Sequence, residues 1–277
     1  MEVNLQSIED TNLLDLERAI FDVLKATLRY PANPQAKAVK LTDDIRFFIN
    51  AAEQGAGIGD TFWYVWGVVL DIVGCVPPGH VWQISLVQAL DNLRHRDGPI
   101  SEYDEHLTSW SWQDLPVLSA SVREKWDDST GTGEDVGEEE FAKWKNLNSF
   151  IARLTYTGFA PWLNLPIWQL REALEEPPVK SAAMNCRLWV ASEWILHCAD
   201  VIYEDMKTGS QLGESTARSL RTGSLCDGET PLSLKRWAFW KKRFSELRAD
   251  ADSLGLDRAI TTYRMTQALE AMDAVEA

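Results

Sequence analysis

The sequence predicts an all-α protein of about nine or ten helices in antiparallel pairs, forming either a compact bundle or a curved helical array. Three observations support this fold class. Apolar residues recur at steps of three and four along most of the chain, capping or breaking residues bound many of these stretches, and no strand-like alternation is sustained. At 277 residues the chain is long enough to bury one large core, so we expect a single helical domain over residues 1–277.

The helices of the first half are bounded by recognisable residues. A stripe of leucines ends at Pro31, and Thr42 precedes two aspartates in the manner of an N-cap. The stretch from Phe62 to Val73 is apolar on nearly every side, which predicts a buried helix. A Pro-Pro-Gly sequence then breaks the chain. The predicted helices of this half cover about 11–30, 42–54, 60–73, 81–93 and 121–126.

An acidic segment separates the two helical halves. Residues 127–140 contain seven acidic side chains and no basic one, and they are rich in Gly and Thr, which is typical of a flexible loop. Loop insertions cost little in helical bundles, so we expect the halves to form one domain. Periodic apolar stripes resume after the loop. They predict helices at about 141–154, 166–176, 180–207, 235–251 and 256–275.

Charge and hydropathy exclude two kinds of partner. The chain has 27 Lys and Arg against 42 Asp and Glu, a net charge of −15, and such a surface repels phosphate backbones. We therefore expect no nucleic acid partner. The apolar stretch from Phe62 to Val76 is interrupted by Gly67, Asp71 and Gly74 and is shorter than the roughly 20 residues that a membrane-spanning helix needs. We therefore predict no membrane span.

The N-terminal segment and the cysteines predict a cytoplasmic protein. Acidic residues stand where a signal or transit peptide would carry basic ones. The four cysteines form no CxxC pair, which argues against a zinc knuckle or a thioredoxin-type motif and suits buried thiols in a reducing compartment. These cysteines are Cys75, Cys186, Cys198 and Cys226.

The chain lacks the signatures of familiar enzyme classes. It contains no GxGxxG sequence opening a strand, no GxxxxGK[ST] loop, no HExxH pair and no GxSxG turn. Asp127 and Asp128 form a poor match to the aspartate-rich motif of all-α terpene cyclases. Only four histidines are present, so a multi-histidine metal centre would need nearly all of them. We expect no cofactor and assign no metal site.

Four segments together resemble a large group of fungal helical proteins that is catalogued only as a domain of unknown function. The segments are residues 144–153 (WKNLNSFIAR), 167–175 (IWQLREALE), 188–197 (LWVASEWILH) and 236–240 (RWAFW). The similarity covers most of the chain after about residue 60. It implies an all-α cytoplasmic protein and, for a number of fungal members, a setting in specialised metabolism. It implies no reaction and no catalytic residues.

The most site-like pattern lies on the predicted helix at 180–207. Glu193, His197, Asp200 and Glu204 are spaced by four, three and four, so all four project from one stripe. A metal accepts these ligand types, and a histidine beside carboxylates can act as a general base, with Glu193 and His197 as the candidate catalytic pair. The alternative, which we favour, is the narrow polar face of a mostly buried helix.

Polar residues on two neighbouring predicted helices form a second candidate site. Asn148 and Arg153 follow the acidic loop, and Arg171 and Glu172 lie on the next helix. If these helices pair, an arginine can reach a carboxylate and lock the structure, or it can hold an anionic ligand. We favour the structural role and keep Asn148, Arg153 and Arg171 as candidate ligand-binding residues.

Tryptophan is unusually frequent, with 13 residues against nine Phe and six Tyr. Each indole buries a large area and still offers one N–H, so clusters of them form rigid helix junctions or flat walls for an aromatic ligand. Most are expected in the core. The candidates for pocket lining are Trp189, Trp194, Trp237 and Trp240.

The predicted helix at 235–251 carries basic residues around its aromatic face. Such a helix can lie on an anionic membrane or bind phosphates. We favour the alternative that its long basic side chains pack along the core and face the acidic loop at 127–140. The basic residues are Lys235, Arg236, Lys241, Lys242, Arg243 and Arg248.

Two hypotheses on function remain. The first is a small-molecule-binding protein of fungal specialised metabolism, with a Trp-lined pocket for an apolar or aromatic ligand, and with a cofactor-independent enzyme as one form of it. The second is a non-catalytic helical module that binds other proteins. A closed cavity with convergent polar groups and a perturbed titratable residue favours the first, and an open apolar groove favours the second.

Overall fold

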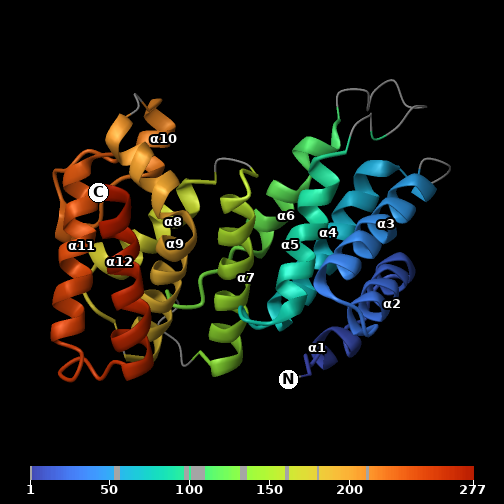
Figure 1. Ribbon diagram of the computed structural model, residues 1–277, viewed down its shortest axis with the longest axis horizontal. Coiled ribbons are helices and arrows are strands. Elements are labelled where there is room, and N and C mark those ends of the chain that lie inside the picture. Colours follow the sequence, from blue (N-terminus) through green and yellow to red (C-terminus); the bar gives the residue numbers. More distant parts are fainter. Residues whose placement is uncertain are drawn as a thin grey trace. The chain divides into compact units, whose positions relative to one another are not determined.

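A computed structural model describes residues 2–52, 57–96, 100, 110–131, 136–159, 162–179, 181–209 and 212–277. Within these ranges the chain is helical and forms no β-strand, which confirms the predicted fold class (Figure 1). The α-helices are α1 (Gln6–Glu9), α2 (Asp15–Arg29), α3 (Pro34–Ala52), α4 (Ile58–Cys75), α5 (Val81–Arg94), α6 (Leu118–Lys125), α7 (Glu138–Tyr156), α8 (Asn164–Leu170), α9 (Ser181–Thr208), α10 (Glu214–Ser219), α11 (Leu234–Ala249) and α12 (Met265–Glu276). Two π-helical turns, η2 (Arg171–Glu175) and η4 (Ile260–Arg264), and two 3-10 turns, η1 (Trp112–Asp114) and η3 (Ser224–Cys226), complete the described structure.

The chain divides into two compact units. The first consists of Met1–Asp128 with Ala142–Phe150, and the second of Ser129–Phe141 with Ile151–Ala277. The division at Asp128 falls at the start of the predicted acidic loop, whose residues 132–135 lie outside the described ranges. Within that loop Thr130 is buried, and its hydroxyl accepts a hydrogen bond from Arg187 Nε at 2.9 Å. The prediction of one domain over the whole chain remains a prediction.

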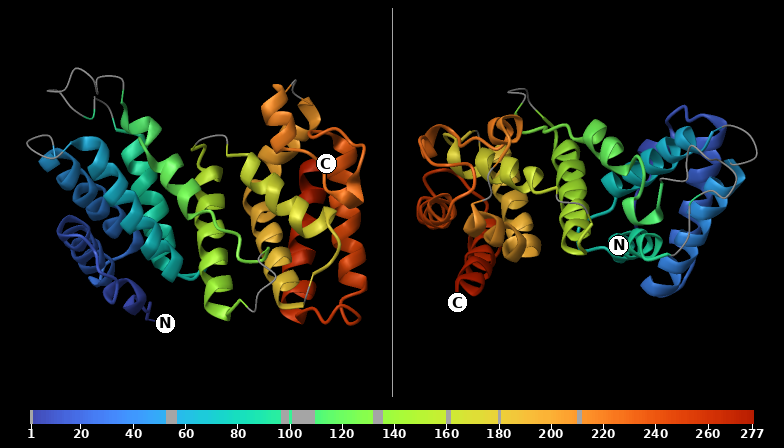
Figure 2. Two further views of the ribbon diagram at one scale, coloured as in Figure 1. Left: turned by 180° about the vertical axis from the view of Figure 1, so that it is seen from behind. Right: turned by 90° about the horizontal axis from the view of Figure 1, so that it is seen from above.

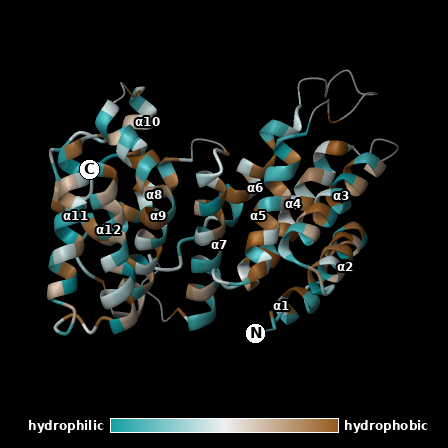
Figure 3. Ribbon diagram, viewed as in Figure 1, coloured by the Kyte–Doolittle hydropathy of each residue, from teal (hydrophilic) through white to brown (hydrophobic). Residues whose placement is uncertain are grey.

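The core of the first unit forms around α4, whose residues are largely hydrophobic (Figure 3). Ten of its residues are buried, which agrees with the predicted central helix. By length and composition α4 could also cross a membrane, and core helices of soluble proteins meet the same criteria. Of the tested window, 56% is buried inside the structure. The expectation that the chain has no membrane span therefore stays a prediction.

Helix α3 begins eight residues earlier than the predicted start at Thr42. Asn33 accepts a hydrogen bond from the Ala36 amide at 2.8 Å, and Pro34 occupies the first helical position, so these two residues form the actual start signal. Thr42 lies inside the helix and is buried. Its hydroxyl donates to the carbonyl groups of Ala38 and Ala89, at 2.8 and 3.2 Å. The expected N-cap at Thr42 was wrong because a buried threonine can bond within its own helix as readily as it can cap one.

The closest-packed helices of the first unit are α3 and α5, which are not consecutive. Lys37 lies near Trp82, Thr42 bonds to the Ala89 carbonyl, and Asp43 pairs with Arg96, so residue numbers rise together along both helices. The two helices are therefore parallel. This arrangement follows because α3, α4 and α5 alternate in direction, so that α3 and α5 run the same way and pack against each other.

A packed aromatic loop precedes α6. The Phe62 ring lies 5.9 Å from Trp110 and 5.8 Å from Trp112, so the tryptophans on either side of Ser111 pack against α4. Leu115 and Val117 adopt positive φ angles of 40° and 69°, which are strained for side chains of their shape. Between them the Pro116 carbonyl accepts a hydrogen bond from Trp66 Nε1 at 2.7 Å, which anchors the strained turn to the core.

The second unit is organised around α9, which lies beside α12 (Figures 1 and 2). These two helices also run parallel, because Asn185 bonds to the Asp257 amide while Glu193, further along α9, bonds to Arg264. By contrast, α11 and α12 are antiparallel, because Trp237 near the start of α11 bonds to Glu276 at the end of α12, while Arg248 bonds to Thr266. Helix α9 kinks at Cys198, where φ is −129° and ψ is 16°.

The cysteines are all free thiols, with Cys75 partly exposed and the other three buried. Burial raises the pKa of Cys198 to about 12, with a smaller contribution from Asp200, and burial raises the pKa of Cys226 to about 11. Because the thiolate is the nucleophile, buried thiols with raised pKa values react slowly.

We therefore expect iodoacetamide at pH 8 to alkylate Cys75 before Cys198 and Cys226 in the folded protein. Peptide mapping by mass spectrometry measures the order of labelling. Denatured protein is the control, because unfolding removes both burial and the pKa shifts and should equalise the rates. Equal rates in the folded protein would contradict the prediction.

Candidate functional site

The sequence-predicted pair Glu193 and His197 meets on α9. Glu193 is buried, with a side chain only 3% exposed, and its Oε1 lies 3.2 Å from His197 Nε2. Arg153 Nη2, from α7, lies 3.8 Å from the same oxygen. Arg264 Nη1, from η4, donates to Oε2 at 2.5 Å. Three elements thus bring cationic or ionisable groups to one buried carboxylate, and we call these four side chains the Glu193 cluster.

Trp189 lies beside the Glu193 cluster, one turn before Glu193 on α9. The guanidinium carbon of Arg264 lies 3.9 Å from the centre of the Trp189 ring, which is a stacked cation–π contact. Arg153, His197 and Arg264 are each about a quarter exposed, so solvent reaches the cationic groups but scarcely reaches the carboxylate. The contact between Glu193 Oε1 and His197 Nε2 orients the imidazole.

The rest of the predicted polar stripe on α9 does not converge on Glu193. Asp200 Oδ1 accepts a hydrogen bond from the neighbouring Val201 amide, and Glu204 pairs with Lys207. In the described ranges no group of three or more His, Cys, Asp or Glu side chains is placed to hold a metal ion. The favoured interpretation of a polar helix face thus fits Asp200 and Glu204, while Glu193 and His197 belong to a wider cluster.

The other predicted polar residues lie at different places. Asn148 is buried and donates from Nδ2 to the Trp144 carbonyl at 2.9 Å within α7. Arg171 donates to the carbonyl groups of Ser219 and Arg221, and it lies 3.7 Å from Glu172. Of the three candidate ligand-binding residues on these helices, Arg153 is therefore the one that contacts Glu193. Sequence reasoning missed Arg264, which lies 71 residues from Glu193.

A second buried charge network surrounds Glu175 in the π-turn η2. Arg236 donates from Nε to Glu175 Oε1 at 2.6 Å and from Nη2 to Oε2 at 3.1 Å. Trp240 Nε1 donates to Oε1 at 2.5 Å, and the Gly223 amide donates to Oε2 at 2.6 Å. Both charged side chains are completely buried. We call these residues the Glu175 network.

The Glu175 network is fully hydrogen-bonded. The remaining N–H groups of Arg236 donate to the carbonyl groups of Leu220, Pro231 and Arg221 at 2.7, 2.7 and 3.3 Å. A buried ion pair with every donor satisfied fixes backbone geometry and leaves no group for a ligand. Its role is therefore to hold the segment between α10 and α11.

The candidate pocket-lining tryptophans differ in exposure. Trp194, Trp237 and Trp240 are buried, and Trp189 is partly exposed. Trp237 Nε1 donates to Glu276 at 2.8 Å, which ties α11 to α12. A ligand-lining role for these four residues remains a prediction.

The basic residues of α11 pair within the second unit. Lys241 binds Asp273 and Glu276 at 2.5 and 2.6 Å, and these hydrogen bonds raise its pKa. Lys242 and Arg243 both pair with Glu246 on α11 itself. The carboxylates in the ion pairs of α11 come from α11, α12, η2 and Glu229, and not from the acidic loop at 127–140 that these basic side chains were expected to face.

A cavity of about 560 Å³ lies in the first unit between α2 and α3. Its walls are mostly apolar or small side chains, with Thr27, Tyr30 and two lysines as the polar members. The lining residues are Val23, Ala26, Thr27, Tyr30, Ala32, Ala36, Lys37 and Lys40. We call this space the α2–α3 cavity; sequence reasoning missed it because periodicity does not reveal how closely two helices pack.

The polar side chains of the α2–α3 cavity, which we call its polar wall, are held in place by contacts with buried groups. Lys37 is 7% exposed and donates to the Leu28 carbonyl at the end of α2, and burial lowers its pKa. Thr27 donates to Asp44 at 2.6 Å, and Lys40 pairs with the same carboxylate. The cavity thus combines apolar walls with one perturbed titratable residue.

Comparison with known proteins identifies the family of the chain. No curated protein and no solved structure is significantly similar to the chain. A family model described as "Protein of unknown function (DUF3632)" matches residues 66–244, which includes the four segments that carry the resemblance seen in the sequence and the residues Glu193, His197 and Glu175. The chain therefore belongs to the DUF3632 family of proteins of unknown function.

Proposed function

We propose that the chain is a small-molecule-binding protein that takes an apolar or aromatic ligand into the α2–α3 cavity. The observation that carries the proposal is the cavity itself. Its volume of about 560 Å³ lies in the range of about 300–1,000 Å³ that is typical of ligand pockets, and its walls are largely apolar. The alternative, a protein-binding module, would use the same space as an open apolar groove, since Ala26, Tyr30, Ala36 and Lys40 are exposed.

The polar wall indicates the kind of ligand. Lys37 and Lys40 carry ammonium groups, which can only donate hydrogen bonds, and Thr27 offers a hydroxyl that is already committed to Asp44. A ligand with an apolar body and one hydrogen-bond-accepting group matches this wall. The walls contain no tryptophan among the lining residues, so this site differs from the Trp-lined pocket that composition suggested.

We place this function in the cytoplasm of a fungus, in specialised metabolism. Two observations support the setting. The resemblance to fungal helical proteins implies it, and the described cysteines are free thiols that suit a reducing compartment.

Ala36→Trp is expected to lower the affinity for an apolar probe at least about tenfold, because the indole would occupy the cavity. Ala36 lines the cavity and is exposed, so the substitution should leave the fold intact. The probe is N-phenyl-1-naphthylamine, whose fluorescence rises in apolar surroundings, and titration of the protein into the probe measures the affinity.

Ala19→Trp is the matched control, because Ala19 is exposed on α2 and is not among the residues that line the cavity. It should bind the probe as the unmodified protein does. Two results would contradict the proposal: equal affinity of the two variants, or no probe binding to the unmodified protein. Either would favour the protein-binding module.

A further inference from the structure

Most arginines of the second unit are paired with carboxylates. The unit contains ten arginines, and seven of them lie within 4.0 Å of an Asp or Glu oxygen: Arg153, Arg171, Arg187, Arg218, Arg236, Arg243 and Arg264. This is the expected outcome in a chain with 42 acidic and 27 basic residues. Among the described residues, Arg221, Arg248 and Arg258 have no carboxylate partner within that distance.

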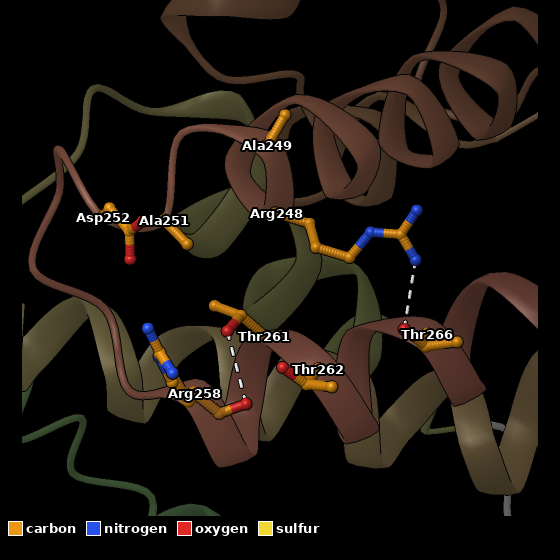
Figure 4. A pocket seen from close by; sticks show the side chains of 8 residues that line it. All are labelled: Arg248, Ala249, Ala251, Asp252, Arg258, Thr261, Thr262 and Thr266. Atoms are coloured by element: carbon orange, nitrogen blue, oxygen red, sulfur yellow. Dashed lines mark hydrogen bonds between the residues drawn. The ribbon is translucent and has the colours of Figure 1, made fainter.

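Arg248 and Arg258 line one polar cleft of about 440 Å³ (Figure 4). The cleft lies between the end of α11 and the segment formed by η4 and the start of α12. Its lining residues are Arg248, Ala249, Ala251, Asp252, Arg258, Thr261, Thr262 and Thr266. We call it the Arg248–Arg258 cleft.

The two arginines of the cleft retain unused hydrogen-bond donors. Arg248 donates from Nη1 to Thr266 Oγ1 at 3.0 Å, and Figure 4 shows its side chain extended along the cleft towards this hydroxyl. The Arg258 guanidinium makes no hydrogen bond or ion pair with any residue in the described ranges, and it points towards the side on which Asp252 lies (Figure 4). Thr262 lies between the two arginines in the same view.

The charges and hydroxyl groups of the cleft favour an anionic ligand. The lining side chains include two guanidinium groups and one carboxylate, so the lining carries a charge of +1 in a chain whose net charge is −15. A guanidinium presents its donors in a fork that matches a phosphate or a carboxylate, and threonine hydroxyls add further donors. The strongly acidic remainder of the chain disfavours a long polyanion such as a nucleic acid.

We propose that the Arg248–Arg258 cleft binds a small molecule through a phosphate or carboxylate group. Arg258 is the principal contact, Arg248 and the hydroxyl of Thr262 complete the donor set, and Asp252 weakens the site by its negative charge. This site belongs to the second unit and the α2–α3 cavity to the first, so the inference stands independently of the function proposed above.

Isothermal titration calorimetry in a low-salt buffer tests the proposal with two probes, inorganic phosphate and citrate. At least one of them should bind the unmodified protein, and their relative affinities distinguish a phosphate from a carboxylate site. Arg258→Ala should weaken binding at least about tenfold, since a hydrogen bond to a charged group is lost. Asp252→Asn should strengthen binding, because it removes the opposing charge.

Arg218→Ala is the matched control. Arg218 is exposed and pairs with Glu214 in the same unit but does not line the cleft, so the substitution changes the net charge equally without touching the site. Thermal melting by circular dichroism verifies that every variant is folded. The proposal is overturned if neither probe binds the unmodified protein, if Arg218→Ala and Arg258→Ala weaken binding alike, or if Asp252→Asn fails to strengthen it.

Discussion

Arg236→Met is expected to lower the free energy of unfolding by about 3–5 kcal/mol, the loss typical of breaking a buried ion pair from one side. The substitution would leave the Glu175 carboxylate charged and completely buried without its guanidinium. It would also remove the donor from three backbone carbonyl groups in the segment between α10 and α11. Urea denaturation followed by far-UV circular dichroism measures the change.

Two comparisons show that this loss comes from the Glu175 network. Arg218→Met removes an ion pair whose side chains are 73% and 90% exposed, and exposed pairs contribute at most about 1 kcal/mol. Combining Arg236→Met with Glu175→Leu should recover part of the stability, because no charge then stays buried alone. Recovery should be incomplete, since Trp240 and the Gly223 amide lose their acceptor. A similar loss in Arg218→Met and Arg236→Met would contradict the assigned role.

The long helices could be predicted from the sequence because their signals are local. Helix α5 was expected at 81–93 and spans Val81–Arg94, and α9 was expected at 180–207 and spans Ser181–Thr208. Both combine a sustained apolar period with breaking residues at their ends. Helices α1 and α10 have four and six residues, too few to show a period, and they were not predicted.

The two π-turns are the part of the fold that could not be predicted from the local sequence pattern. A π-turn inserts one residue into a helix without changing its apolar stripe appreciably, so the segments at η2 and η4 were predicted as ordinary helices. Each turn carries an essential member of a charge network, Glu175 in η2 and Arg264 in η4. Glu175 and Arg264 therefore lie in the two segments whose backbone conformation was hardest to predict from the sequence.

The Glu193 cluster was predictable where its contacts are close in sequence. Glu193 and His197 are four residues apart on one helix, and that spacing alone brings them together. Arg153 was identified as able to reach a carboxylate, but the prediction did not name Glu193 as its partner. Arg264 comes from a helix that runs parallel to α9, and neither its partner nor the parallel packing follows from the apolar period of either helix.

Glu193→Ala is expected to lower the free energy of unfolding by about 2–3 kcal/mol, whereas His197→Ala should lower it by less than about 1 kcal/mol. Removing the carboxylate leaves Arg264 without its short charged hydrogen bond, although the stacking on Trp189 remains. Because Arg264 and Arg153 are about a quarter exposed, water can solvate them partly, so the loss should be smaller than that at Glu175. Urea denaturation of both variants, with the unmodified protein, measures these changes.

The difference between the two variants separates the roles within the Glu193 cluster. Glu193 faces three partners from three elements, so its charge is needed for the packing of α7, α9 and η4. His197 contributes one contact at 3.2 Å and is otherwise partly open to solvent, so its removal should leave the fold intact. Equal destabilisation by both substitutions would contradict this division of roles, because the imidazole would then contribute to the fold as much as the carboxylate does. A stable His197→Ala protein would instead be the proper reagent for testing acid–base chemistry at this site, because any loss of activity in it could not be attributed to unfolding.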